Sequence, residues 1–192
     1  MTELVPAADS RKADLEFRTV YEAHCGYVLS TLRRLGVRER DLEDVGHEVF
    51  LAVYRRLGDY DGVRPLRPWI FGFCFRAASN FRARAHLRRE VVDDNLDELV
   101  ADAAPAADEQ IAAGQRRALV NAALAKIELS RRAVFVMHEI DGCAIPDVAS
   151  ALGISPNTAY SRLRVAREEF SAAVKRLEGL RRAPRTEEGH DE

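Results

Sequence analysis

A helix-turn-helix motif limits the fold of this chain more than any other feature. In "IPDVASALGISPNTAYSRL", which begins at residue 145, two amphipathic helical patterns flank a tight corner. Gly153 allows the turn, and Ser155 followed by Pro156 is a strong helix start, because serine caps a helix and proline suits its first position. Small residues at Ala149 and Ala159 let the two helices cross closely. We therefore expect two helices packed across this corner.

The second helix of the motif presents a polar face. At about 100° per residue, Ala159 and Leu163 share one side with Ala166 and Phe170. The opposite side carries groups that read a major groove, since arginine forks onto guanine and asparagine onto adenine. These groups are Asn157, Tyr160, Ser161 and Arg164. Arg162 and Arg167 flank them and are suited to phosphate contacts.

Charge divides the chain into blocks, although its net charge is only −2. Residues 17–89 carry 14 Lys+Arg against 8 Asp+Glu, a net of +6, and residues 116–182 carry 12 against 7, a net of +5. Residues 90–115 between them have 8 acids and no base. We interpret this as two basic domains joined by an acidic linker at 90–110, since low hydrophobicity and one charge sign oppose collapse. Composition alone favours a merely solubilising linker.

The first basic block begins with an amphipathic pattern, "DLEDVGHEVFLAVYRRL". Apolar residues recur at steps of three and four behind Asp41, which we expect to cap the helix. Asp44 and Glu48 lie four residues apart and therefore on one side, near His47. Taken alone, this charged side is a solvated face.

A second helix is predicted in "LRPWIFGFCFRAASNFRARAHLRRE", opened by Pro68. Five aromatic residues fall between Trp69 and Phe81, and the helix ends in arginines without an acid between them. Aromatic side chains of this kind usually belong to a core. Aromatics that run into a basic helix end also suit single-stranded nucleic acid, because bases stack on rings and phosphates need cations.

Several functional classes are excluded by what the sequence lacks. No run of apolar residues is long enough for a membrane span, and the N-terminus has no signal-peptide pattern, so we expect a cytoplasmic protein without membrane insertion. The three cysteines lack CxxC spacing and are expected as small buried thiols. The five histidines show no metal spacing, and no phosphate loop is present. We expect no enzyme, no cofactor and no metal.

One more helix is predicted in the second block. Ser130 is expected to cap it, and Asp141 with Gly142 to end it, because glycine adopts the left-handed conformation at low cost. Together with the helix-turn-helix motif, it makes the block from about residue 111 to 180 wholly helical.

Across roughly residues 17–180 the chain resembles a bacterial sigma factor of the extracytoplasmic-function (ECF) group, the two-domain kind with sigma regions two and four. The resemblance rests on "DLEDVGHEVFLAVYRRL", on "RPWIFGFCFRAASNFRARAHLRR" and on "RRAVFVMHEIDGCAIPDVASALGISPNTAYSRLRVAREEF", in this order. It implies an all-α fold of two small helical domains and a flexible acidic linker. The implied segments are an N-terminal tail (1–16), region two (17–89), the linker (90–110), region four (111–180) and a C-terminal tail (181–192).

The resemblance also implies a role for each group of residues in promoter-specific initiation of transcription. Duplex DNA of the minus-thirty-five element would be bound by Asn157, Thr158, Tyr160, Ser161, Arg162, Arg164 and Arg167. Unpaired minus-ten DNA would be bound by Arg67, Trp69, Phe75, Arg76, Asn80, Arg82 and Arg84. Core RNA polymerase would be bound by Asp44, His47 and Glu48. The implied partners are the β′ clamp helices and β flap of polymerase, promoter DNA and an anti-sigma factor, with the linker along the RNA path.

Two other classes stay open on the residues alone. A one-component regulator would use the helix-turn-helix on duplex operators, usually as a symmetric dimer. An interaction protein would bind polymerase or a regulator without reading DNA. The discriminating feature is the aromatic and arginine-rich helix at 69–89, which neither alternative requires.

Overall fold

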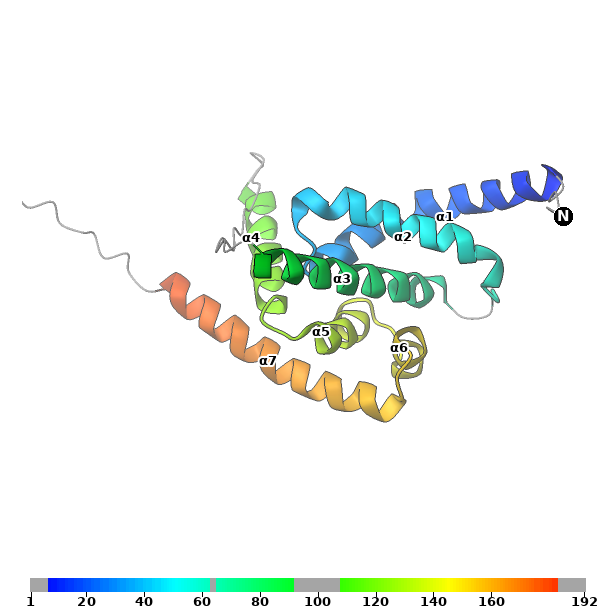
Figure 1. The fold of residues 1–192 in the computed structure, drawn as a ribbon. Helices are drawn as coiled ribbons and strands as arrows, with labels where there is room; N and C mark the ends of the chain where they lie inside the picture. The colour runs from blue at the N-terminus through cyan, green and yellow to red at the C-terminus, as the bar shows by residue number, and fades with distance from the viewer. Residues whose placement is uncertain (1–6, 63–64, 92–107, 183–192) are drawn as a thin grey trace, which may run out of the picture.

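The computed structural model describes residues 7–62, 65–91 and 108–182, and all of their regular elements are helical (Figure 1). This confirms the all-α prediction. The main helices are α1 (Ala7–Arg34), α2 (Leu42–Arg56), α3 (Leu66–Val91), α4 (Asp108–Leu124), α5 (Leu129–Phe135), α6 (Ile145–Leu152) and α7 (Pro156–Arg182). Short 3-10 turns at Glu39–Asp41 and Leu57–Asp59 flank α2, and a π-helical turn, Val136–Ile140, follows α5.

The boundaries differ from the predicted segments at several places. Helix α1 begins at Ala7, inside the expected N-terminal tail, and helix α3 begins two residues before Pro68. Both ends of the expected linker are helical, because α3 runs to Val91 and α4 starts at Asp108. The rest of the linker, residues 92–107, lies outside the described residues, as do the ends of both tails.

Helices α1, α2 and α3 form the first helical group, with an apolar centre. Leu32 of α1, Val53 of α2 and Phe71 of α3 are fully buried. The buried residues of α2 recur at steps of three and four, as its sequence pattern predicts. Asp41 occupies the N-cap position of α2, as the sequence predicts, but its side chain makes no capping hydrogen bond.

Helices α4 to α7 form the second helical group and contain the predicted helix-turn-helix. Gly153 closes α6 in the left-handed conformation, with φ of 65° and ψ of 36°. The Thr158 amide donates to Ser155 Oγ at 3.1 Å, so Ser155 caps the start of α7. Ala159 and Leu163 are buried against the core. The helix-turn-helix prediction is thus confirmed in its corner, its cap and its packed face.

A different residue from the predicted one caps α5. Glu128 is the N-cap, and its carboxylate accepts from the Ser130 and Arg131 amides at 3.0 and 3.3 Å. The expectation for Ser130 was therefore wrong, because the helix begins one residue before it, at Leu129, and the Glu128 carboxylate reaches the free amides of its first turn. The predicted end of this helical segment is confirmed, since Asp141 closes the π-helical turn and Gly142 has a φ of 71°.

The two helical groups pack against each other. Figure 1 shows α1, α2 and α3 along one side of the molecule and α5, α6 and α7 along the other, with α4 at one end. Helix α6 contacts α3, and helix α4 contacts α1. Buried apolar side chains form one continuous cluster that includes Phe71 of the first group and Met137 of the second.

Candidate nucleic-acid interface

The N-terminal half of α7 exposes the polar face that the sequence predicts. Asn157, Tyr160, Ser161 and Arg164, which we call the duplex face, are all exposed, and Tyr160 retains 60% of its surface. The Ser161 hydroxyl donates to the Thr158 carbonyl at 3.0 Å. Arg167 is exposed, whereas Thr158 and Arg162 are half-buried at the edge of this surface. The turn and cap described above hold the duplex face clear of the core.

Acidic residues neutralise two of the arginines on α7. Arg164 Nη1 donates to Glu168 Oε1 at 2.8 Å, one helical turn further on. Arg167 Nε donates to Glu139 at the end of the π-helical turn at 2.7 Å. These ion pairs are exposed, so a DNA phosphate can replace the carboxylate at modest cost.

The residues predicted to bind single-stranded DNA lie along α3 and differ in their exposure. Arg67, Arg76, Asn80, Arg82 and Arg84 are exposed, whereas Trp69 and Phe75 are half-buried. The Arg76 guanidinium lies 4.8 Å from the ring centre of Phe73, and the Trp69 ring lies 4.7 Å from the same ring. The structure thus brings Trp69, Phe73 and Arg76 together, and Phe73 is not among the residues that the sequence predicts to bind DNA.

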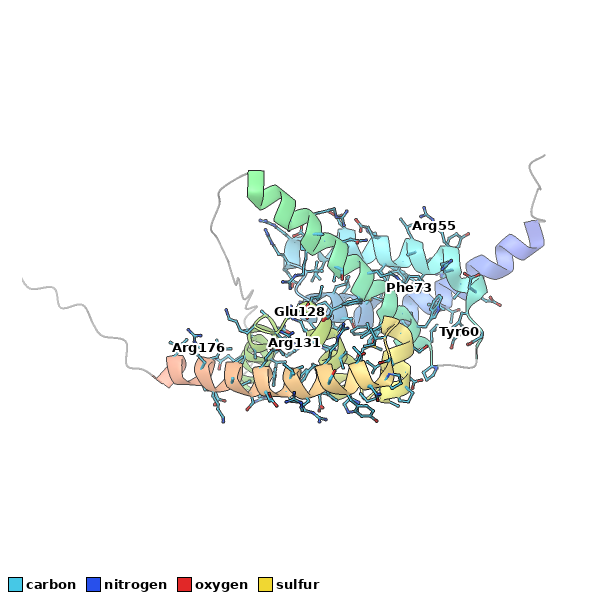
Figure 2. All side chains as sticks on the ribbon, turned by 60° about the horizontal axis from the view of Figure 1, so that its bottom comes forward. Arg55, Tyr60, Phe73, Glu128, Arg131 and Arg176 are labelled. Carbon is cyan, nitrogen blue, oxygen red and sulfur yellow. The ribbon has the colours of Figure 1, made fainter. Side chains whose placement is uncertain are left out.

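An open pocket of about 240 Å³ lies between α3 and α6, and we call it the junction pocket. Trp69, Phe73 and Arg76 line it from α3, and α6 contributes the opposite wall. Figure 2 shows Phe73 and Tyr60 at the same end of the molecule as α6. Phe75 does not line this pocket, because two residues along a helix point to nearly opposite sides. The spacing of Trp69 and Phe73, four residues apart, was the signal in the sequence.

The predicted polymerase-binding residues are exposed on α2. Asp44, His47 and Glu48 share one face, as their spacing predicts. Glu48 accepts from both terminal nitrogens of Arg84 on α3, at 3.0 to 3.1 Å. A predicted polymerase contact therefore holds a predicted DNA contact in a forked ion pair.

Four residues connect the two helical groups, and we call them the junction cluster: Tyr27, Arg34, Arg67 and Asp141. Tyr27 Oη donates to Asp141 Oδ2 at 2.8 Å, and Arg34 Nη1 donates to Asp141 Oδ1 at 3.3 Å. Arg67 lies 5.4 Å above the centre of the Tyr27 ring. Burial raises the pKa of Asp141, although its bond from Tyr27 and the charge of Arg34 act the other way. Burial and the Asp141 charge raise the pKa of Tyr27.

The three cysteines differ in how deeply they are buried. Cys74 is buried, whereas Cys25 and Cys143 are only half-buried, which departs from the expected buried thiols. Burial, followed by the charge of Asp141, raises the pKa of Cys143 to about 11.

Among the described residues, no cluster of three or more His, Cys, Asp or Glu side chains could bind a metal ion. In the described part of the chain, no helix combines the length and apolar character that crossing a bilayer requires.

Comparisons with known proteins point to one family. Residues 117–170 match the family described as Sigma-70, region 4. The RNA polymerase sigma factor CnrH of Cupriavidus metallidurans is 31% identical over 148 residues, which span 74% of this chain and 78% of CnrH. The ECF RNA polymerase sigma factor SigE of Mycolicibacterium smegmatis is 26% identical, across 88% of this chain and 65% of SigE.

Solved structures of similar proteins agree with the fold. CnrH in complex with the cytosolic domain of CnrY has a TM-score of 0.58 and 26% identity, and the match covers 83% of this chain and 87% of CnrH. The sigma factor RpoE of Bartonella quintana, in complex with the anti-sigma factor NepR, has a TM-score of 0.62. RpoE is 17% identical over 83% of this chain and 97% of its own, so its likeness supports the fold alone.

Proposed function

The chain belongs to the extracytoplasmic-function (ECF) group of bacterial RNA polymerase sigma factors, and we propose that its two helical groups divide promoter recognition between them. In this proposal, residues 17–89 form region two and residues 111–180 form region four. The first group would bind polymerase and unpaired DNA, and the second would bind duplex DNA. The chain would act without a catalytic site of its own, in the cytoplasm, where RNA polymerase works.

We propose that the duplex face enters the major groove of the minus-thirty-five element. Its exposed Asn157 and Arg164 carry the amide and guanidinium groups that read adenine and guanine edges. Tyr160 and Ser161 would reach phosphates or base edges beside them. Thr158, Arg162 and Arg167, at the border of this face, would position the helix on the backbone. The observation that carries this proposal is the exposure of the duplex face on a capped and packed helix.

For the minus-ten element, we propose capture of unpaired bases along α3. Trp69 and Phe73 supply stacking surfaces in the junction pocket, and Arg76 lies beside them for a phosphate. The remaining proposed contacts follow the helix: Arg67, Phe75, Asn80, Arg82 and Arg84. Stacking on aromatic rings is available to a melted strand and not to paired bases, which supports this division of labour.

Core polymerase would bind the exposed face of α2 through Asp44, His47 and Glu48. The β′ clamp helices are the proposed partner of this face, and the β flap is the proposed partner of the second group. Because Glu48 is paired with Arg84, polymerase binding at Glu48 would also release Arg84 toward DNA. An anti-sigma factor is a further proposed partner, by analogy with CnrH, which was solved in complex with the cytosolic domain of CnrY.

The test is initiation by purified components. The chain is added to bacterial core RNA polymerase with genomic DNA, and the promoters that it opens are sequenced, with core polymerase alone as the control. We expect transcripts that start downstream of a shared pair of motifs, which core alone does not produce. Absence of promoter-specific initiation would refute the proposal. Binding of a palindromic operator by the chain alone would instead identify a one-component regulator.

A further inference from the structure

One ion pair, which we call the forked pair, joins Glu48 of α2 to Arg84 of α3 across 36 positions of the chain. Arg84 Nη1 and Nη2 both donate to Glu48 Oε1 at 3.1 Å, and Nη2 also donates to Oε2 at 3.0 Å. The two helices pack against each other within the first helical group (Figure 1). Hydrogen bonds from both terminal nitrogens fix the direction of the guanidinium as well as neutralising its charge.

Arg84 stands at the end of the side of α3 that we propose for unpaired DNA. At about 100° per residue, three other proposed contacts fall within about 80° of it around the helix axis: Trp69, Arg76 and Asn80. From Trp69 to Arg84 this side of the helix is about 22 Å long, at roughly 1.5 Å per residue. A single strand that stacks on Trp69 and follows α3 would therefore meet Arg84 last.

The Glu48 carboxylate uses the same donors of Arg84 that a DNA phosphate would use. Arginine binds carboxylate and phosphate alike through parallel N–H groups, so the two anions compete for one guanidinium. The Arg84 side chain is 52% exposed and the Glu48 side chain 47%. Because neither charge is buried, one anion can replace the other without the large desolvation penalty of an interior ion pair.

Glu48 also belongs to the face of α2 that we propose for polymerase. Asp44 lies one helical turn earlier on that face, and it has no ion-pair partner among the residues that the structure describes. Glu48 is thus the member of this face whose charge is already used within the chain. A basic group of a partner that binds Glu48 would draw its carboxylate away from Arg84.

We propose that Glu48 is a positioning residue that withholds Arg84 from DNA in the free chain, and that polymerase binding at Glu48 transfers Arg84 to a phosphate of the unpaired strand. Conversely, DNA bound at Arg84 frees Glu48 for polymerase, because coupling between two binding sites is equal in both directions. The part played by polymerase rests on the proposed function. The competition between Glu48 and DNA for Arg84 can be measured on the chain alone.

The first test measures binding of a labelled single-stranded DNA oligonucleotide of mixed sequence to the free chain at several salt concentrations. We expect Glu48→Gln to bind about two- to fivefold more tightly, which corresponds to the loss of an exposed competing ion pair. The slope of log affinity against log salt should steepen by about 0.7, because one more phosphate is neutralised. In a chain that also carries Arg84→Ala, Glu48→Gln should change neither the affinity nor the slope.

Asp44→Asn is the matched control, because it removes one negative charge from the same face of α2 without removing a partner of Arg84. It should leave the salt slope unchanged, and its effect on affinity should be the same with and without Arg84→Ala. All of these residues are exposed, so each variant should keep the circular dichroism spectrum of the unmodified chain. Equal slopes for Glu48→Gln and Asp44→Asn, or an effect of Glu48→Gln that persists with Arg84→Ala, would overturn the proposal.

The second test repeats the oligonucleotide titration with saturating core RNA polymerase, and core polymerase alone gives the background. Because polymerase then occupies Glu48, Glu48→Gln should no longer strengthen binding, whereas Arg84→Ala should weaken it severalfold. Strengthening by Glu48→Gln that persists in the holoenzyme would overturn the transfer of Arg84 by polymerase.

The two tests also separate this inference from the proposed function. If Glu48→Gln strengthens binding to the free chain through Arg84 but core polymerase gains no promoter-specific initiation, the competition at Arg84 stands and the proposed function fails. If initiation occurs but Glu48→Gln leaves the affinity and salt slope of the free chain unchanged, the competition is refuted and the proposed function stands.

Discussion

Arg164 and Arg18 have the same local environment but different proposed roles. Each guanidinium donates to a glutamate four residues later, at 2.8 Å, on an exposed helix surface. Only Arg164 belongs to the duplex face. Comparing variants of these two arginines therefore separates the effect of losing a surface ion pair from the effect of losing a DNA contact. Exposed ion pairs of this kind contribute little to stability.

Replacing Arg164 should impair recognition of the minus-thirty-five element. We expect Arg164→Ala to cost about 1–3 kcal/mol of discrimination at one base position if the guanidinium reads a base, and to weaken all sequences evenly if it contacts phosphate. The measurement is binding of the holoenzyme to promoters with single base changes. Arg18→Ala is the control and should leave promoter binding unchanged. Unchanged affinity in Arg164→Ala would remove this residue from the duplex face.

Arg132 shows how a buried charge can serve structure alone. Its guanidinium donates to the carbonyl of Ala125 at 2.9 Å and to that of Ile127 at 2.8 Å, just beyond the end of α4. Burial lowers the pKa of Arg132 to about 10, and the nearby charge of Arg82 adds to this effect. The side chain completes the turn between α4 and α5, because these carbonyls lack other helical partners.

Removing this guanidinium should destabilise the second helical group. We expect Arg132→Met to lower the free energy of unfolding by about 2–4 kcal/mol, because the buried Ile127 carbonyl and the part-buried Ala125 carbonyl lose their donor, at a cost of roughly 1–3 kcal/mol each. Urea denaturation followed by circular dichroism measures this change. Arg131→Met, which removes only an ion pair with Glu169 nearer the surface, should have a smaller effect. An equal loss in both variants would contradict the structural role of Arg132.

His24 links stability to pH. Burial, followed by the charge of Arg67, lowers the pKa of His24 below its ordinary value of 6.5, and the Nδ1 atom is buried without a hydrogen-bond partner. The unfolded chain therefore binds a proton at higher pH than the folded chain does. The stabilising contribution of the neutral ring is complete above about pH 6.5 and is lost as the pH falls below that value.

Replacing His24 should remove part of this dependence. We expect the melting temperature to fall less between pH 7 and pH 5.5 in His24→Gln than in the unmodified chain. Thermal unfolding across this range measures the difference. His47→Gln is the matched control, because His47 is exposed on α2, and it should retain the original pH dependence. A steeper fall in His24→Gln would contradict the assigned direction of the pKa change.

At the scale of single elements, the sequence was sufficient to predict those features whose interacting residues lie close together along the chain. The cap by Ser155, the left-handed Gly153 and the buried side of α7 each depend on neighbours within one or two helical turns. The cap of α5 was mispredicted because propensity favours serine at an N-cap, whereas α5 begins at Leu129 and the Glu128 side chain precedes it. Local preference alone does not decide which side chain reaches an amide.

The start of α7 provides the test at this scale. We expect Ser155→Ala to lower the free energy of unfolding by about 1 kcal/mol, because the Thr158 amide loses its acceptor. Ser171→Ala changes an exposed residue in the interior of the same helix, where alanine is the better helix former, and should be neutral or slightly stabilising. Urea denaturation of both variants measures the difference. Equal stabilities would exclude Ser155 as an energetically important cap.

At the scale of the whole molecule, the packing between the helical groups could not be predicted from the sequence. Tyr27 and Asp141 are 114 positions apart, and no periodicity connects them. Charge segregation indicated two domains, and both blocks are basic, which gives no reason to expect contact. The apolar residues of α3 and α6 resemble ordinary core positions in either block. For the same reason, the sequence did not identify Phe73 as a pocket residue, since the surface that faces it comes from the other helical group.

The bond between Tyr27 and Asp141 should therefore contribute to global stability, and a double-mutant cycle can isolate it. Because one apolar cluster runs through both groups, we expect Trp69 fluorescence and circular dichroism to report a single coincident unfolding transition in urea. Tyr27→Phe and Asp141→Ala should each destabilise the chain, with a coupling energy on the order of 1–2 kcal/mol, since the hydrogen bond joins a hydroxyl to a buried carboxylate. A parallel cycle of Arg18→Ala with Asp141→Ala should show additive effects, because Arg18 is paired with Glu22 whereas Asp141 is bonded to Tyr27 and Arg34. Additivity of Tyr27→Phe and Asp141→Ala would mean that the two groups are not coupled through this bond.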